Sequence, residues 1–101
     1  MEIEHGKIKG DIELTSDMEL NGMISGNAIV KSGAELILHG LVTKNLVVEK
    51  GGTVRLHGTV SGDVINNGGL LQVSGRIVGN LLEQSGETII TPGAKIGSRT
   101  S

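Results

Sequence analysis

The sequence predicts an all-β fold in which one chain winds into a three-sided β-solenoid of about five to six coils, with about 18 residues in each coil. The pattern Gly-x-[Ile/Val] recurs at Gly6, Gly22, Gly40, Gly58 and Gly75, in steps of 16, 18, 18 and 17 residues. Apolar residues alternate within each step, which is the period of a β-strand and not of a helix. The chain has 17 Gly and no Phe, Trp or Tyr, so its interior must be narrow and filled by aliphatic side chains.

The elements expected in chain order form one domain over residues 1–101. Residues 1–5, MEIEH, match the end of a later coil, such as LILH or VRLH, and form a partial first coil. Each later step has room for three short strands. In the last segment, Pro92 suits a terminal strand because proline cannot donate a hydrogen bond to a neighbour. Residues 98–101 are expected to be a frayed tail.

The bends between strands are marked by glycine. Gly51-Gly52, Asn67-Gly68-Gly69 and Ser85-Gly86 lie between apolar runs. Glycine adopts positive φ without steric cost, and asparagine tolerates it better than most residues. We therefore expect sharp corners with positive φ at these three places.

Stacking the coils turns equivalent positions into columns, with like side chains about 4.8 Å apart along the axis. A single coil cannot stand alone, because its backbone groups need partners above and below. The columns expected to point inward are Ile8, Ile24, Val42, Val60, Ile77; Ile12, Ala28, Leu46, Val64, Leu81; Met18, Leu36, Val54, Leu71, Thr88; and Leu20, Leu38, Leu56, Val73, Ile90.

The repeats are similar to those of a known family. GKIKGDIEL, GTVSGDVIN and GRIVGNLLE resemble the coils of the bactofilins, the polymer-forming β-solenoids of bacteria, and the likeness covers nearly the whole chain. The resemblance implies a right-handed, three-sided β-helix that assembles end to end without nucleotide. It also implies a cytoskeletal or scaffold role.

Composition argues against several partners. The net charge is −2 and the basic residues are scattered, whereas a nucleic-acid partner needs a basic face. The absence of cysteine removes disulfides, thiolate metal sites and cysteine nucleophiles. The chain is charged from its second residue and has no apolar run of membrane-spanning length. We therefore expect a bacterial, cytoplasmic protein without a membrane segment.

No residues form a catalytic, cofactor or metal site in the sequence. His5, His39 and His57 occupy one coil position, and only His39 and His57 fall on adjacent coils, which is too few ligands for a metal. A second polar column reads Asp11, Asn27, Asn45, Asp63, Asn80, and we expect it to be structural. IVGN and KIGS faintly resemble the repeats of the left-handed hexapeptide acyltransferases, but no inserted loop is present to build their site. We expect no enzyme activity and no cofactor.

Two surfaces are candidates for protein contacts. An outward column on the second strand of four successive coils carries only aliphatic residues, which usually marks an interface. End-to-end contacts are expected where the outermost strands lack partners. The interface residues predicted on the sides are Ile29, Val47, Ile65, Leu82, Met23 and Leu41, and those at the ends are Ile3, Ile8, Ile90 and Ile96.

Two functions follow from these surfaces. The first is a structural, bactofilin-like protein that forms a homo-oligomer or filament through the ends of its solenoid. The second is a protein-binding module that does not polymerise, such as the immunity partner of a toxin, and that uses the aliphatic side column. The second hypothesis stays open because the Pro-rich flanks and apolar N-terminal segment typical of bactofilins are not in this sequence.

Overall fold

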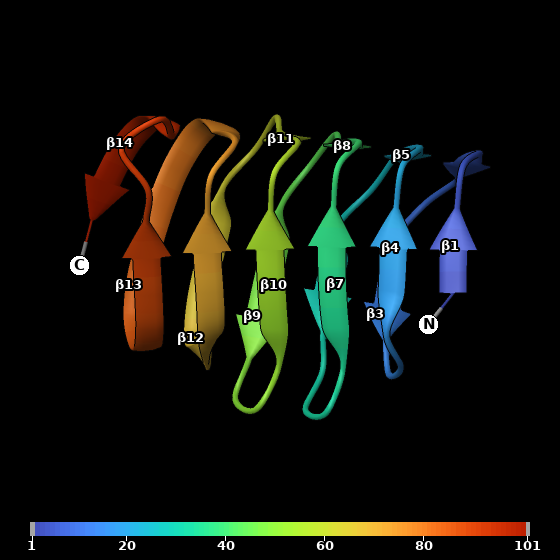
Figure 1. Ribbon diagram of the computed structural model, residues 1–101, viewed down its shortest axis with the longest axis horizontal. Coiled ribbons are helices and arrows are strands. Elements are labelled where there is room, and N and C mark those ends of the chain that lie inside the picture. Colours follow the sequence, from blue (N-terminus) through green and yellow to red (C-terminus); the bar gives the residue numbers. More distant parts are fainter. Residues whose placement is uncertain (1, 101) are drawn as a thin grey trace.

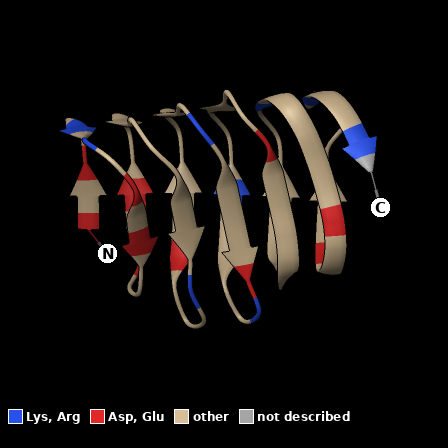
Figure 2. Ribbon diagram, turned by 180° about the vertical axis from the view of Figure 1, so that it is seen from behind, with Lys and Arg blue, Asp and Glu red and all other residues tan. Residues whose placement is uncertain are grey.

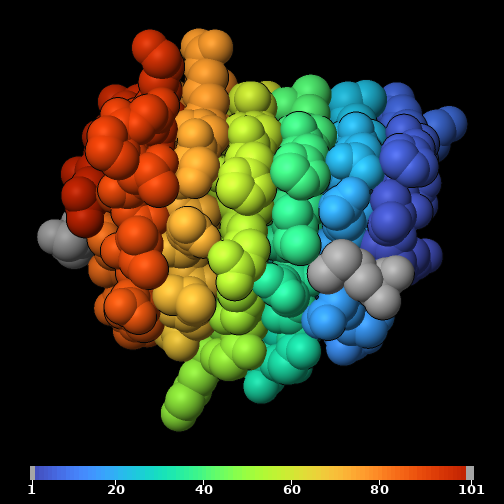
Figure 3. All heavy atoms as spheres, viewed as in Figure 1, coloured from blue at the N-terminus to red at the C-terminus, as the bar shows by residue number. Residues whose placement is uncertain are grey.

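The computed structural model describes residues 2–100 and confirms the predicted β-solenoid (Figure 1). Its strands form one 14-stranded sheet in which the neighbouring strands of successive coils run parallel. In Figure 1 the strands nearest the viewer point up, the chain then returns behind them, and each coil lies further to the left than the one before it. This combination of rotation and advance makes the winding right-handed (Figures 1 and 2). Figure 3 shows each coil as a separate band, in sequence order along the longest axis.

The strands divide among three sides of the prism, which we name A, B and C. Side A contains β1 (Glu2–Glu4), β4 (Met18–Leu20), β7 (Glu35–Leu38), β10 (Thr53–Leu56) and the last parts of β12 (Val64–Val73) and β13 (Arg76–Ile90). Side B contains β2 (Lys7–Ile8), β5 (Met23–Ile24), β8 (Leu41–Val42), β11 (Thr59–Val60) and the first parts of β13 and β14 (Lys95–Thr100). Side C contains β3 (Ile12–Leu14), β6 (Ala28–Val30), β9 (Leu46–Glu49), the first part of β12, the middle of β13 and the end of β14.

The register of these pairs confirms the four predicted inward columns. Ile24 pairs with Val42 on side B, and Leu36 pairs with Val54 on side A. In the central coils their members are fully buried, and toward both ends they become partly exposed. The core is therefore a thread of Leu, Ile and Val along the axis, as the absence of aromatic residues required.

A fifth inward column lies on side C. It reads Leu14, Val30, Val48, Asn66, Glu83. Asn66 is a polar residue with no exposed surface in an otherwise aliphatic core. Its side-chain amide donates to the Glu87 carbonyl and to Thr88 Oγ1, at 2.9 Å each, and its Oδ1 accepts from the Gly69 N–H at 3.0 Å. These bonds tie the corner of one coil to the next and leave none of the amide's polar atoms unsatisfied.

Glycine is required at one corner by close packing and not by φ. A Cβ on Gly40 would overlap the carbonyl oxygen of Gly22, and the same holds for each later member of this glycine column against the member before it. Positive φ occurs elsewhere, at Gly51, Gly68 and Gly86 among the predicted corners, whereas no residue other than glycine adopts it among those described. Each of the three predicted corners therefore contains one glycine with positive φ, and Asn67 does not adopt it.

A ladder of polar side chains fixes a second corner. The backbone N–H of Asn27 donates to Asp11 Oδ1 at 2.8 Å, and that of Asn45 donates to Asn27 Oδ1 at 2.9 Å. Asp63 and Asn80 continue the ladder with bonds of 2.8 Å each. The predicted structural role of this column is confirmed, because each side chain satisfies a backbone donor of the following coil.

Two predictions about the C-terminal segment were wrong. Residues 98–100 are not a frayed tail: Ser98 and Arg99 lie in β14, paired with Asn80 and Leu81 of β13. Residue 101 lies outside the described residues. Pro92 lies in a turn and not in a strand, and this turn is closed by a hydrogen bond from the Ala94 N–H to the Thr91 carbonyl at 3.1 Å. The extra strand pairs with β13 on two sides of the prism, with a register shift between Ile77 and Asn80.

Gly40→Ala should lower the free energy of unfolding by about 1–3 kcal/mol or more, because the new methyl group overlaps a backbone carbonyl that cannot move without breaking the stack. Gly93→Ala is the matched control, since a Cβ there meets no atom within 4 Å. Urea unfolding followed by far-ultraviolet circular dichroism measures both, because the chain has no Trp or Tyr for fluorescence. Equal stability of the two variants would contradict the packing argument.

Asn66→Ala should cost about 1–3 kcal/mol in unfolding free energy, because it leaves the buried Gly69 N–H and the Glu87 carbonyl without their side-chain partner. The neighbouring Asn67 is exposed, and Asn67→Ala should change stability by less than about 0.5 kcal/mol. A loss of similar size in both variants, measured by the same unfolding experiment, would show that burial of Asn66 is not the cause.

Candidate protein interface

The predicted aliphatic column lies on side C in unbroken register. Ile29 pairs with Val47, Val47 with Ile65, and Ile65 with Leu82, while Glu13 lies at the N-terminal end of the same column. All four aliphatic side chains are half-buried by their neighbours, so the surface is a shallow apolar ridge and not a set of protruding groups.

The edges of this column are polar. On one edge lies the Asn/Asp ladder, and on the other Lys31 Nζ forms an ion pair with Glu49 Oε1 at 3.0 Å. Met23 and Leu41, which were predicted to belong to the same interface, pair with each other in a different outward column on side B. The structure therefore does not bring them into register with the side C column.

The most exposed large apolar residues lie elsewhere. Ile3 is 56% exposed, Val78 49% and Ile89 45%. Ile3 and Ile89 occupy the same outward column of side A at opposite ends of the solenoid. This column reads Ile3, Glu19, Ile37, Arg55, Gln72, Ile89. End contacts at Ile3 were predicted from the sequence and Ile89 was missed, although the repeat register alone would have aligned the two.

At the N-terminal end, β1, β2 and β3 have no strand pairing on their outer edges among the described residues. Ile8 lies in its predicted inward column and packs partly on the core. Ile3 points outward instead, and the inward positions of β1 are held by Glu2 and Glu4, which pair with Met18 and Leu20. Inward-pointing charges on an edge strand discourage unspecific strand pairing.

At the C-terminal end the core also becomes polar. Ile90 lies at the end of its predicted inward column, Ile96 extends the column of Ile77, and both pack partly on the core. Beside them Arg99, paired in register with Leu81, forms an ion pair with Glu83, with Arg99 Nη2 and Glu83 Oε1 at 3.0 Å. The hydrogen bond from the Arg99 guanidinium lowers the pKa of Glu83, against an opposing effect of burial.

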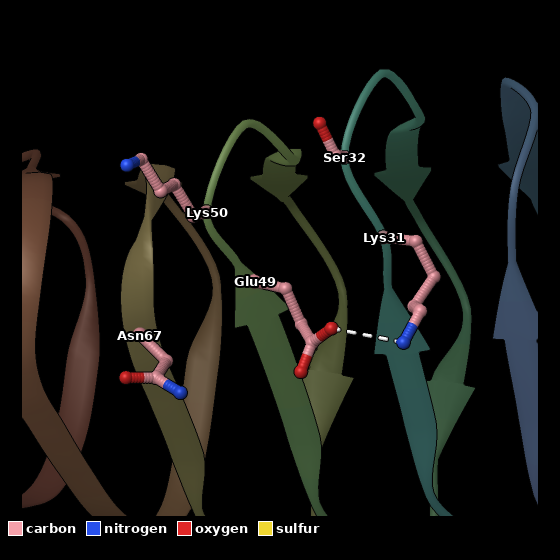
Figure 4. A pocket seen from close by; sticks show the side chains of 5 residues that line it. All are labelled: Lys31, Ser32, Glu49, Lys50 and Asn67. Carbon is pink, nitrogen blue, oxygen red and sulfur yellow. Dashed lines mark ion pairs between the residues drawn. The ribbon is translucent and has the colours of Figure 1, made fainter.

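Two surface hollows offer no built ligand site. The larger, about 400 Å³, lies between the turns at Lys31–Ser32 and Glu49–Lys50, beside Asn67. Figure 4 shows the Lys31 and Glu49 side chains pointing toward each other while Lys50 points away. The hydrogen bond and ion pair with Glu49 raise the pKa of Lys31, and the charges of these two residues compensate each other. The smaller, about 210 Å³, lies near Arg76, Val78 and Lys95 at the C-terminal end of side B.

The histidine column has the predicted arrangement. The rings of His39 and His57 stack with centroids 5.1 Å apart and an angle of 13° between their planes. Within residues 2–100 no group of three or more His, Asp or Glu side chains is placed to hold a metal ion. The stacked pair lies at the corner between two successive coils.

No protein-family model, curated protein sequence or solved structure matches this chain. Function must therefore be argued from the surfaces themselves. Over residues 2–100, no helix has the length and apolar character needed to cross a membrane.

Glu83→Gln should destabilise the protein near pH 7 and lose this effect in acid. The folded pKa of Glu83 is lowered, so its contribution to stability is present above the unfolded pKa of about 4.3 and disappears as pH falls through the folded pKa. The difference in unfolding free energy between wild type and variant should therefore shrink steadily below about pH 4.3.

Glu87→Gln, on an exposed position of the same final coil, is the control for this experiment. Thermal unfolding between pH 3 and pH 7, followed by circular dichroism, gives the three profiles. A difference between Glu83→Gln and wild type that persists unchanged into acid would contradict a role for the ion pair with Arg99.

Proposed function

We propose that this protein is a structural, bactofilin-like scaffold that self-associates through the ends of its solenoid and needs no nucleotide. The observation that carries the proposal is the pair of open ends. Within residues 2–100, β1, β2 and β3 at one end, and the last part of β13 and β14 at the other, have strand partners on their inner edges only. Open parallel edges are templates for a further strand.

The apolar columns support the same proposal. Ile8 and Ile12 at one end, and Ile90 and Ile96 at the other, are only partly covered, whereas Ile24 and Val60 in the interior have no exposed surface. Full burial of an exposed aliphatic side chain contributes roughly 1.5–3 kcal/mol. Association costs about 4–15 kcal/mol in lost freedom. Several end residues together with the backbone ladder are therefore needed, which favours assembly at raised protein concentration.

The proposed role is not enzymatic. The polar columns already have structural partners, since the Asn/Asp ladder bonds the backbone and His39 stacks on His57. A general acid–base pair needs two titratable groups in unlike environments around one reacting atom, and neither column provides this arrangement. We place the scaffold in a bacterial cytoplasm, which rests on the family resemblance and the absence of cysteine alone.

A second function is favoured by one specific observation, the aliphatic column on side C. Ile29, Val47, Ile65 and Leu82 form a continuous ridge with no charge on it. A stable interface buries about 800 Å² on each partner, so a partner would have to extend over the flanking corners as well. In this alternative the protein is a binding module for another protein and its ends do not associate.

Light scattering across a range of protein concentrations separates the two functions. The scaffold predicts an average mass that rises with concentration and elongated particles in negative stain. A mass that stays at one chain over the whole range would overturn the scaffold proposal.

The double variant Val47→Lys with Ile65→Lys serves as the matched comparison, since it alters side C and leaves both ends intact. The scaffold predicts unchanged association. Loss of a bound heterologous protein with folding and end-to-end association intact would favour the binding module.

A further inference from the structure

We propose that the ends meet head to tail: the C-terminal coil of one copy receives β1, β2 and β3 of the next copy, with Ile89 lying directly beside Ile3 of that copy. This inference rests on the proposed end-to-end association and specifies which end meets which. Three independent features of the structure point in the same direction: the outward column of side A, the hydrogen-bonded corner ladder and the charges of the two ends.

The first feature is the outward column of side A. Its interior positions are polar or half-buried, and its two ends are Ile3, 56% exposed, and Ile89, 45% exposed. If β1 of the next copy pairs with the last part of β13 in the register that the interior coils use, Ile3 of that copy lies directly beside Ile89. The two end residues then cover each other, and they do so without any change in the geometry that the interior coils already use.

The second feature is the direction of the corner ladder. In every observed step the backbone N–H of the later coil donates to the side-chain oxygen of the earlier coil, from Asn27 on Asp11 to Asn80 on Asp63. The N-terminal end of the ladder therefore presents a backbone donor, at Asp11, and the C-terminal end presents a hydroxyl oxygen, at Ser98, which pairs in register with Asn80. Only a head-to-tail contact brings donor to acceptor.

The third feature is charge. Residues 2–17 hold five acidic and two basic residues, whereas residues 84–100 hold one acidic and two basic residues. Figure 2 shows acidic residues on β1 at one end and basic residues on β14 at the other. A contact between two N-terminal ends would bring Glu2 and Glu4 beside their own copies, and like charges directly opposite are destabilising.

The inward positions of the junction also fit. In continued register Thr88 lies beside Glu2 of the next copy, and Ile96 lies beside Ile8 of that copy. Thr88 Oγ1 already accepts from the Asn66 amide, so its hydroxyl hydrogen can be donated to the Glu2 carboxylate. Glu4 already accepts the Gly6 N–H at 3.1 Å, which satisfies part of its charge within its own chain. The junction therefore buries the Glu2 carboxylate against a donor, whereas Glu4 lies beside Ile90 in the same register and keeps only the donor of its own chain.

Cysteine crosslinking tests the pairing directly, because the natural chain contains no cysteine. Ile3→Cys and Ile89→Cys are made on copies with tags of different mass, and both positions are exposed enough to substitute without unfolding. Adjacent parallel strands lie about 4.8 Å apart, which is within the Cα separation of about 4.4–6.8 Å that a disulfide accepts. Ile37→Cys, in the middle of the same column, is the control for random collision.

Each variant is oxidised alone and the two are oxidised as a mixture, with circular dichroism confirming that both stay folded. The inference predicts a disulfide-linked mixed dimer in the mixture and no dimer from Ile3→Cys alone, Ile89→Cys alone or the Ile37→Cys control. Dimers from a single variant alone, or association without any crosslink, would overturn the head-to-tail contact and leave end-to-end association standing. A single-chain mass by light scattering at every concentration would overturn both.

Discussion

Every feature of this protein depends on the close parallel stacking of one coil on the next. At a rise of about 4.8 Å the neighbour of each residue is the equivalent residue of the adjacent coil. The same constraint explains why Gly40 must be glycine and why Asn45 can bond the coils on either side of it. For the same reason, a substitution at one position affects the other residues of its column.

The regular part of the fold could be predicted because the stacking repeats. Gly-x-[Ile/Val] at a nearly constant step gives the period, and once the period is known the inward columns follow from the alternation of side chains. The sequence could not give the winding direction in the same way, because the inward and outward pattern is the same for either hand. That expectation came from family resemblance, and the right-handed winding agrees with it (Figure 1).

The features that were missed or wrongly predicted lie where the repeat changes. Asn66 occupies an aliphatic position of its column, and only the contacts with Glu87, Thr88 and Gly69 explain why an amide is tolerated there. Arg99 was expected in a frayed tail because its segment is short and polar. Its pairing with Leu81 and its ion pair with Glu83 hold that segment as a strand. Local composition does not reveal partners that lie a full coil away.

The candidate interface was predictable only in part, for a related reason. Periodicity identifies a column, so Ile29, Val47, Ile65 and Leu82 were found together, but it does not measure exposure, and these residues are half-buried. Ile3 and Ile89 are more exposed because they lie where neighbouring coils are missing. The ends of a solenoid thus carry surface properties that no interior repeat shares.

The charged residues at the two ends also affect which strand edges could be added to the solenoid. An aliphatic core left open at both ends would add any parallel edge in any register, since Leu, Ile and Val differ little in what they accept. Glu2 and Glu4 at one end, and Arg99 with Glu83 at the other, occupy inward positions that the interior fills with aliphatic residues. Charges at these positions penalise every contact that leaves them unpaired, because an uncompensated buried charge is costly. These charges therefore restrict which strand edges could pair with the ends, and they lie in the same columns that hold the coils together.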